Sequence, residues 1–334
     1  MQKLMFIFIF IFISFMNIVA VEIWDLKIEK EIPYTDISSD FFGTGYSFLN
    51  TLPNNDIIFY NNNSTYYIYD VDKKKLNVIN TKGKGPGEFQ SPSRFILFNN
   101  QFYCIDKDKR SLIIYTKNFQ YVNEIRLDFS PLAIFNYSDS YFGIISSPLD
   151  SENLINLYDK TNKKQKSFLS STEPIEKYKS KVNKNFFYST AHYFMNKNIL
   201  YIFFGNIPII QKYDFSEEKS EFIDYKEQLS FKPTAPILEY NLKAALYFCY
   251  PIYPLSKNNI VFKAGNRNSI KETLDETQYY AFKFSFITEK IEMIKINNKE
   301  ISNSIFHTVF YKDKSLLFFN DENEKLEYYE IKKK

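Results

Sequence analysis

The chain of 334 residues has the composition of a folded protein with a high aromatic content. Aromatic residues make up 19% of it and hydrophobic residues 45%, enough for a large core, whereas 8 glycines and 12 prolines are too few for a collagen-like or low-complexity chain. The 42 Lys and Arg residues nearly balance the 39 Asp and Glu residues and form no basic stripe. Because nucleic-acid binding depends on concentrated positive charge, we expect no nucleic-acid partner.

The first twenty residues have the pattern of an export signal. Lys3 is followed by an apolar run of 16 residues, Leu4 to Val19, and Ala20 offers a small residue at a cleavage site. The run is shorter than the roughly 20 residues that span a bilayer. We therefore predict a signal peptide over residues 1–20, a periplasmic or secreted protein, and no membrane span after cleavage. Ile18 fits the small-residue rule poorly, so anchoring by an uncleaved N-terminal segment is the alternative.

A repeated pattern of short apolar strands and polar turns fills residues 21–334. In each unit an aromatic residue stands near the end of one strand, at Tyr69, Tyr115, Tyr158, Tyr213, Phe282 and Tyr328. The spacings are 46, 43, 55, 69 and 46 residues. Short strands repeating at about this period are typical of β-propellers, whose blades are four-stranded sheets. The sequence therefore predicts one all-β domain, a six-bladed β-propeller of four-stranded antiparallel blades.

An N-terminal strand is predicted to close the ring. The inner strands of the six blades are predicted at Gly45–Leu49, Arg94–Phe98, Leu132–Tyr137, Thr190–Phe194, Ala245–Tyr250 and Ser304–Phe310. The last unit runs out of chain after three strands. Trp24, Leu26 and Ile28 alternate with Asp25 and Lys27, which is the period-2 pattern of a half-buried strand. Pairing this segment with the last blade would complete that blade and cover its edge.

A glycine-rich stretch, Gly83 to Phe89, stands between the first two units. In this stretch the chain resembles bacterial six-bladed β-propellers related to NHL-repeat and TolB-like propellers, and the blade pattern extends the resemblance over residues 22–331. The resemblance implies an exported scaffold without a single shared reaction. Many of these relatives are lipoproteins, and this chain has no cysteine near its cleavage site.

The same stretch is interpreted as a structural corner. Its residues are Gly83, Gly85, Pro86, Gly87, Glu88 and Phe89. We expect positive φ at the glycines and a rigid bend at the proline. A phosphate-binding loop is excluded, because such loops open a helix and this one leads into a strand.

The extra chain of the longer units is predicted at one end of the blades. In each blade the turn between the first two strands and the turn between the last two lie at one end, named here the short-turn end. The turn between the second and third strands and the crossover to the next blade lie at the other end, named the crossover end. The inserts at the crossover end are Ser170–Ser189, Lys226–Lys243 and Gly265–Thr277, joined by the Gly83–Phe89 corner. The turns Asn99–Asn100 and Asp106–Arg110 are taken as short opposite turns. Since insertions in repeat proteins tend to build one binding face, we expect binding at the crossover end; simple surface insertions are the alternative.

Candidate binding residues lie in the inserts and on the inner strands. They are Tyr178, Phe187, Tyr188 and Phe231, together with Arg94, His192 and His307. The aromatic residues suit a partner interface, and their alternative is packing of the inserts onto the blades. The alternative role for Arg94 is to form a salt bridge with Glu88.

A non-enzymatic binding module for a protein or glycan partner, acting as a monomer, is the favoured function. No nucleophile elbow, zinc-protease or Cys-x-x-Cys motif occurs, and the predicted inner strands contain no carboxylates for calcium. No metal or cofactor is therefore expected. The alternative is a hydrolase or lyase at the channel mouth, in which Arg94 binds an anionic group and His192 and His307 act as acid or base.

The two cysteines, Cys104 and Cys249, are predicted to lie on opposite blades. Blades 2 and 5 of six are diametrically opposed. A disulfide needs Cα atoms within about 7 Å, so we expect no bond between them.

Overall fold

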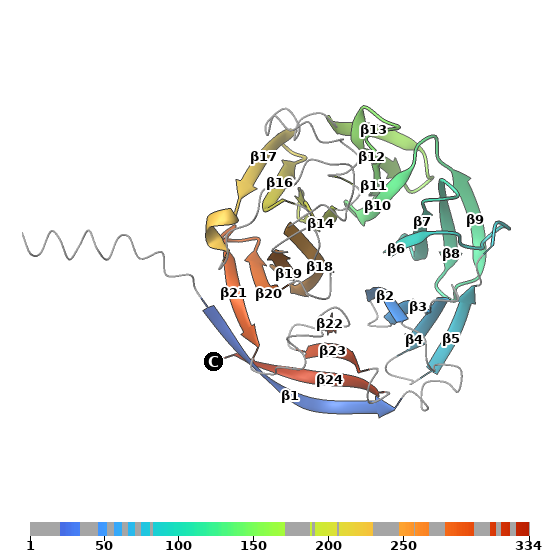
Figure 1. Cartoon of the computed structure of the whole chain (residues 1–334). Helices are drawn as coiled ribbons and strands as arrows, with labels where there is room; N and C mark the ends of the chain where they lie inside the picture. Colours follow the sequence, from blue (N-terminus) through green and yellow to red (C-terminus); the bar gives the residue numbers. More distant parts are fainter. Residues whose placement is uncertain are drawn as a thin grey trace, which may run out of the picture.

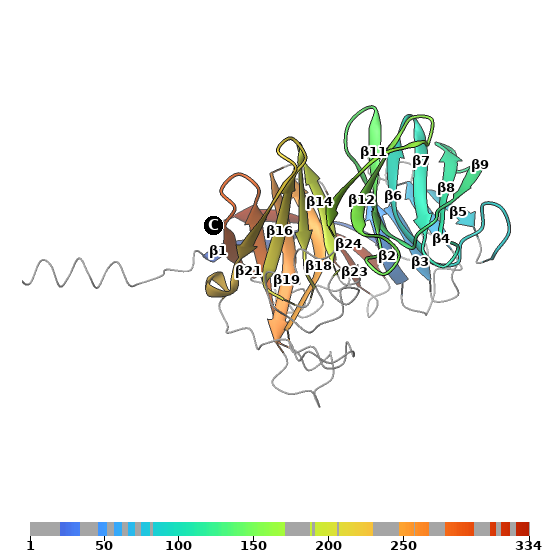
Figure 2. The ribbon, with the colours of Figure 1, turned by 90° about the horizontal axis from the view of Figure 1, so that it is seen from above.

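Six blades surround a central axis in the computed structural model, and they form four four-stranded sheets and one eight-stranded sheet (Figure 1). The structure describes residues 21–33, 46–51, 57–61, 66–70, 75–80, 83–170, 188, 191–205, 207–229, 247–256, 258–266, 278–296, 308–311, 315–320 and 325–333. In each blade one edge strand lies nearest the axis and the other edge strand lies at the rim. Seen from its side, the ring shows the blades standing next to one another (Figure 2). No helix in the described ranges is long and apolar enough to cross a membrane.

The first three blades are four-stranded antiparallel meanders. Blade 1 has β2 (Tyr46–Thr51), β3 (Ile57–Asn61), β4 (Tyr66–Asp70) and β5 (Lys75–Asn80). Blade 2 has β6 (Pro92–Phe98), β7 (Gln101–Asp106), β8 (Ser111–Thr116) and β9 (Tyr121–Arg126). Blade 3 has β10 (Pro131–Asn136), β11 (Tyr141–Ser146), β12 (Asn153–Asp159) and β13 (Lys164–Ser170).

The other three blades continue the ring. Blade 4 has β14 (His192–Asn196), β15 (Ile199–Phe203), β16 (Ile209–Asp214) and β17 (Lys219–Asp224), followed by the 3-10 turn η1 (Lys226–Gln228). Blade 5 has β18 (Tyr247–Ser256), β19 (Asn259–Asn266), β20 (Gln278–Ser285) and β21 (Ile291–Ile296). Blade 6 has β22 (Thr308–Tyr311), β23 (Ser315–Asn320), β24 (Lys325–Lys333) and, as its outer strand, β1 (Val21–Pro33). The six-bladed fold is confirmed, and each predicted inner strand overlaps the innermost strand of its blade.

The N-terminal strand β1 closes the ring, as predicted, and it does so with a second contact. Its residues from Trp24 to Pro33 pair antiparallel with β24, which completes blade 6. Its residues from Val21 to Trp24 pair in parallel with Met293–Ile296 of β21, the outer strand of blade 5. Blades 5 and 6 thus form one continuous eight-stranded sheet, and Figure 1 shows β1 along the rim beside both.

The repeated aromatic residues mark the third strand of every blade, where each of the six predicted positions is found. The turn that follows is built alike in blades 2 to 5. A Thr, Asp or Ser side chain at the end of the third strand accepts a hydrogen bond from a backbone N–H two residues later in the turn. The accepting residues are Thr116, Asp159, Asp214 and Ser285. Three or four residues later comes a residue with positive φ: Phe119, Asn162, Glu218 or Glu289. Local polar turn chemistry therefore defines where these hairpins reverse.

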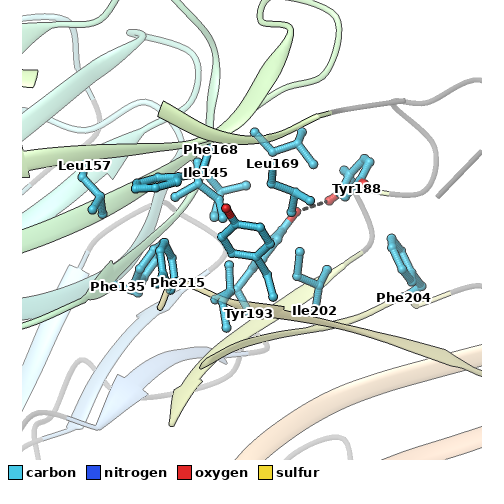
Figure 3. Close-up of a cluster of buried hydrophobic side chains, with 14 of the residues drawn as sticks. Phe135, Ile145, Leu157, Phe168, Leu169, Tyr188, Tyr193, Ile202, Phe204 and Phe215 are labelled. Carbon is cyan, nitrogen blue, oxygen red and sulfur yellow. Dashed lines mark hydrogen bonds between the residues drawn. The ribbon is translucent and has the colours of Figure 1, made fainter. Parts of the chain in front are cut away.

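The described core lies between blades, because alternate residues of each strand face opposite neighbours. In β8, Leu112 and Ile114 join the cluster between blades 2 and 3, whereas Ile113 and Tyr115 join the one between blades 1 and 2. The cluster between blades 3 and 4 is shown in Figure 3. In blades 2 to 4 both faces of the middle strands are thus largely buried, which explains why the sequences of these strands are mostly apolar.

Candidate interaction face

The Gly83–Phe89 segment forms a closed corner. The N–H of Gly83 donates to the carbonyl of Phe89 at 2.9 Å, and the N–H of Glu88 donates to the carbonyl of Gly85 at 3.1 Å. Pro86 and Gly87 lie between the latter two, and Gly87 has φ of 73°. Proline followed by a glycine with positive φ is the pattern of a type II turn. The predicted bend at Pro86 is therefore found.

The expectation of positive φ at all three glycines of this corner is wrong for two of them. Among the described glycines only Gly87 has positive φ. The Glu88 carboxylate instead overlaps the Cβ position at Gly83 and lies within 2.9 Å of that at Gly85, so it occupies space that a side chain at either glycine would need. That carboxylate accepts the N–H of Gly85 at 2.6 Å. Glu88 thus fills the inside of its own turn.

Blade 2 holds the corner through a lysine and an aspartate. Lys109, whose side chain is only 9% exposed, donates to the carbonyls of Gly85 and Glu88 at 3.0 and 3.1 Å and pairs with Glu124 at 2.7 Å. The buried Asp106 carboxylate accepts backbone N–H groups of Gln90 at 2.6 Å and of Lys109 at 3.0 Å. The turn Asp106–Arg110 therefore lies at the crossover end, so its assignment to the opposite end was wrong. It joins the second and third strands of its blade, and such turns share an end with the crossovers.

The corner also extends along the outer flank of blade 2. The hydroxyl of Tyr115 donates to the carbonyl of Gly87 at 2.6 Å, and the ring of Tyr121 lies against Gly87. Both tyrosines adjoin the turn at the short-turn end. Burial raises the pKa of Tyr115, which keeps its hydroxyl protonated as a donor. The corner therefore packs against blade 2, and its last residue, Phe89, is fully buried against Phe95.

Blades 2 and 3 have equivalent crossover ends. A Ser-Pro pair begins the inner strand of each, and the carbonyls of Ser91 and Ser130 accept the N–H groups of Lys107 and Ser147 at 3.0 and 2.8 Å. A carboxylate caps each serine N–H, Asp106 in blade 2 and Asp150 in blade 3. The hydrogen bond from Ser130 lowers the pKa of Asp150 below its ordinary value, and the charge of Arg110 acts in the same direction.

An exposed pair of side chains results at this end. Arg110, 51% exposed, lies 3.7 Å from Asp150 and connects the turns of the two blades. Leu149, 64% exposed, stands at the tip of the blade 3 turn, where its N–H donates to the Ser147 hydroxyl at 3.3 Å. We name Arg110 and Leu149 the crossover pair. Sequence reasoning missed both, and the Ser-Pro repeat was the signal that could have aligned the two turns.

Tyr188 is placed by the structure in the core. It is fully buried between blades 3 and 4, its carbonyl accepts the hydroxyl of Tyr193 at 2.9 Å, and its ring packs on Phe204 (Figure 3). Its own hydroxyl lies 3.4 Å from the Gln211 side-chain oxygen. Of the four aromatic candidates, Tyr188 is thus found in a packing role. Tyr178, Phe187 and Phe231 lie outside the described residues.

Of the three inner-strand candidates, His192 is the one whose side chain lies in the described part of the chain. His192 is the first residue of β14, half-buried and paired with Phe203. Arg94 lies on β6 with its side chain outside the description, and His307 is outside it altogether. The ranges described contain no group of three or more His, Cys, Asp and Glu residues placed to hold a metal ion.

Solved structures of similar fold come from Bacteroides. A DUF4221-family protein of Bacteroides vulgatus is 11% identical with a TM-score of 0.58, over 93% of this chain and 98% of that one. A Bacteroides fragilis protein named for its expected export is 13% identical with a TM-score of 0.53, over 93% and 99%. A Bacteroides thetaiotaomicron protein of unknown function is 10% identical with a TM-score of 0.51, over 91% and 72%. Identities this low show a shared fold alone. No curated protein matches the chain.

One family model matches more than half of the sequence. It is DUF5128, described as a 6-bladed beta-propeller, and it covers residues 47–227. That range runs from β2 through blade 4 and includes the Gly83–Phe89 corner and the crossover pair. The chain therefore belongs to the DUF5128 family of six-bladed β-propellers.

Proposed function

We propose that this protein is an exported binding module that holds a protein partner at the crossover end of blades 2 and 3. Export is supported by the apolar N-terminal run and by the name of the Bacteroides fragilis protein of similar fold. The kinship with NHL-repeat and TolB-like propellers stays a prediction that rests on the corner motif and blade pattern. A scaffold role agrees with a fold that hosts many unrelated functions.

The crossover pair is the observation that carries this proposal. Leu149 exposes most of an aliphatic side chain, and its chain neighbour Asp150 lies 3.7 Å from the Arg110 guanidinium, which is a long distance for an ion pair. An exposed ion pair of this kind contributes little to stability. Arginine is enriched at protein interfaces, and an aliphatic group gains free energy by entering an apolar pocket. A protein with an apolar pocket beside a carboxylate fits these two side chains.

The backbone beneath the pair is held in place before any partner arrives. The Ser147 N–H donates to the Ser130 carbonyl at 2.8 Å, and the Leu127 N–H donates to the Arg110 carbonyl at 2.8 Å. The Ser146 hydroxyl donates to the carbonyl of Asn153 at 2.7 Å. Preorganisation of this kind lowers the entropy lost on binding. Side-chain replacement can therefore be tested without disturbing the turn.

The test compares two exposed apolar residues at opposite ends of the ring. Ile287, 72% exposed, lies in the turn after β20 at the short-turn end and is the matched control for Leu149. A photo-crosslinking amino acid is first introduced at position 149 or at position 287, in the cells that produce the protein. The protein that becomes crosslinked is then identified as the partner. Its affinity is then measured for Leu149→Glu, Arg110→Glu and Ile287→Glu.

We expect both crossover variants to weaken binding at least about fivefold, a loss on the order of 1 kcal/mol, and the Ile287 variant to bind like wild type. All three positions are exposed, so the fold should be retained, which circular dichroism checks. Loss of binding in Ile287→Glu alone would place the partner at the short-turn end and refute the proposal. Equal affinity in all three variants would do the same.

A further inference from the structure

The strand β1 occupies a slot between two other strands. On one side it makes nine residue pairs with β24, from Trp24 to Pro33, and on the other it makes four with β21, from Val21 to Trp24. It joins the rest of the chain through residues 34–45, which lead to β2. The strand that closes the ring is thus held there by pairing with the C-terminal blades.

We infer that two copies of this chain can exchange β1, so that each closes the ring of the other. Every pair that β1 makes within its own chain can form equally with the same slot of a second copy. The exchanged form would lack no backbone pairing, which makes such exchange a low-energy route to dimers. A slot left empty would expose two strand edges, and proteins avoid this hazard.

The slot fits β1 better than an unrelated strand. Its occupant must run parallel to β21 and antiparallel to β24, changing sides at Trp24, and it must accommodate an irregularity between Ile28 and Lys30. The register places Asp25 opposite Lys332 and Lys27 opposite Glu330, against one like-charged pair, Glu31 and Glu327. Opposite charges at facing positions stabilise a strand pair. Direction, register and charge together specify a copy of β1.

Concentration during folding decides between the two forms. A segment joined by a short connection has an effective concentration in the millimolar range, roughly 1 mM. Folding at concentrations far below this favours closure within one chain. Folding near it allows a second copy to compete, and the exchanged dimer then persists because separation requires β1 to leave both edges.

The test uses full chains that carry one engineered cysteine each. Asp25→Cys and Lys332→Cys are made in separate molecules, because these residues face each other across the strand pair. The two are unfolded, mixed, refolded from about 10 μM to about 1 mM, and mildly oxidised. Only exchange brings the two cysteines together. Mixing Asp25→Cys with Glu327→Cys is the control, since residue 327 faces Glu31 instead.

We expect a disulfide-linked dimer with a 25–332 bond, identified by mass spectrometry, that rises at least about tenfold over that concentration range. The Glu327 control should give no bond at these positions. A monomeric mass by light scattering at every concentration, with no 25–332 bond, would overturn the inference. An equal yield in the control would overturn it too, because it would show random association. A variant with both cysteines in one chain must form the bond within the monomer at low concentration, which verifies the register.

Discussion

Trp24 pairs with Ile296 of β21 on one side and with Lys333 of β24 on the other. At this residue the N-terminal strand passes from the outer edge of blade 5 to that of blade 6. One backbone position thereby joins the two blades that the chain builds last. Ring closure in this protein is a link between two neighbouring blades as well as the completion of one.

Removal of this strand should open the ring. A chain that starts at Val21 keeps every pair of β1, whereas a chain that starts at Pro33 exposes the edges of β21 and β24. We expect the first to fold as a stable monomer and the second to aggregate or to melt at a clearly lower temperature. Light scattering and thermal unfolding measure this. An unchanged monomer without residues 21–32 would contradict the closure.

The turn at Gly87 should not tolerate a side chain. Gly87→Ala places a Cβ at φ of 73°, within 2.7 Å of the Tyr121 ring. Left-handed backbone alone costs about 1–2 kcal/mol for a residue other than glycine, so we expect at least that loss in urea unfolding. Lys84→Ala, on the exposed part of the same corner, is the control and should stay within about 0.5 kcal/mol. Equal stabilities would refute the type II turn.

Tyr188 should act through packing. Tyr188→Ala removes a fully buried ring from the cluster between blades 3 and 4, and such deletions cost about 3–5 kcal/mol. Tyr188→Phe keeps the ring and loses a hydroxyl whose distance to Gln211 is 3.4 Å, so it should cost no more than about 1 kcal/mol. Chemical denaturation gives both values. A stable Tyr188→Ala variant that fails to bind a partner would instead support the binding role.

Stability should fall at alkaline pH. Burial raises the pKa of Tyr158 to about 12, with the nearby Asp128 acting in the same direction, and burial raises the pKa of Tyr193 as well. In the unfolded chain a tyrosine has a pKa of about 10. The protonated, folded state is therefore fully favoured below about pH 10 and loses this advantage as the pH rises toward 12.

Unfolding midpoints measured across that pH range, together with tyrosinate absorbance, check this dependence. Tyr158→Phe keeps the buried ring and removes one ionisation, so its stability should fall less steeply than that of the wild type. A flat profile up to pH 12 would show that these hydroxyls do not resist ionisation.

The two cysteines should titrate as thiols. Cys104 lies on β7 of blade 2, buried, with its sulfur 3.5 Å from the Ile105 carbonyl, and Cys249 lies on β18 of blade 5. Blades 2 and 5 face each other across the ring, whereas a disulfide requires Cα atoms within about 7 Å. Titration of the denatured, unreduced protein should find two thiols per chain. An intramolecular disulfide found by mass spectrometry would contradict this arrangement of blades.

The blade count and the strand that closes the ring could be predicted because their signals are local. A strand needs alternation over a few residues, a turn needs polar or glycine residues, and the aromatic residue of each third strand recurs with every blade. The strand β1 could therefore be predicted from the alternation of Trp24, Leu26 and Ile28. The six units could be predicted from the aromatic residues that recur from Tyr69 to Tyr328. The bend at Pro86 could be anticipated for the same reason, since proline restricts its own backbone.

Contacts between blades lay beyond this reasoning, since they depend on which faces meet when the sheets assemble. Nothing within Val21–Trp24 shows that the segment lies parallel to β21, because that edge becomes available only when blade 5 stands beside blade 6. The sequence suggests that Gly83 is a turn glycine with positive φ, yet its distinguishing contact is with the Glu88 carboxylate, which folds back onto it. Arg110 and Leu149 have no distinctive sequence pattern, and they share one end of the ring because the turn of blade 2 contacts the turn of blade 3 through Arg110 and Asp150. Local pattern sets each strand and turn, and the packing of one blade against the next sets which side chains remain exposed together.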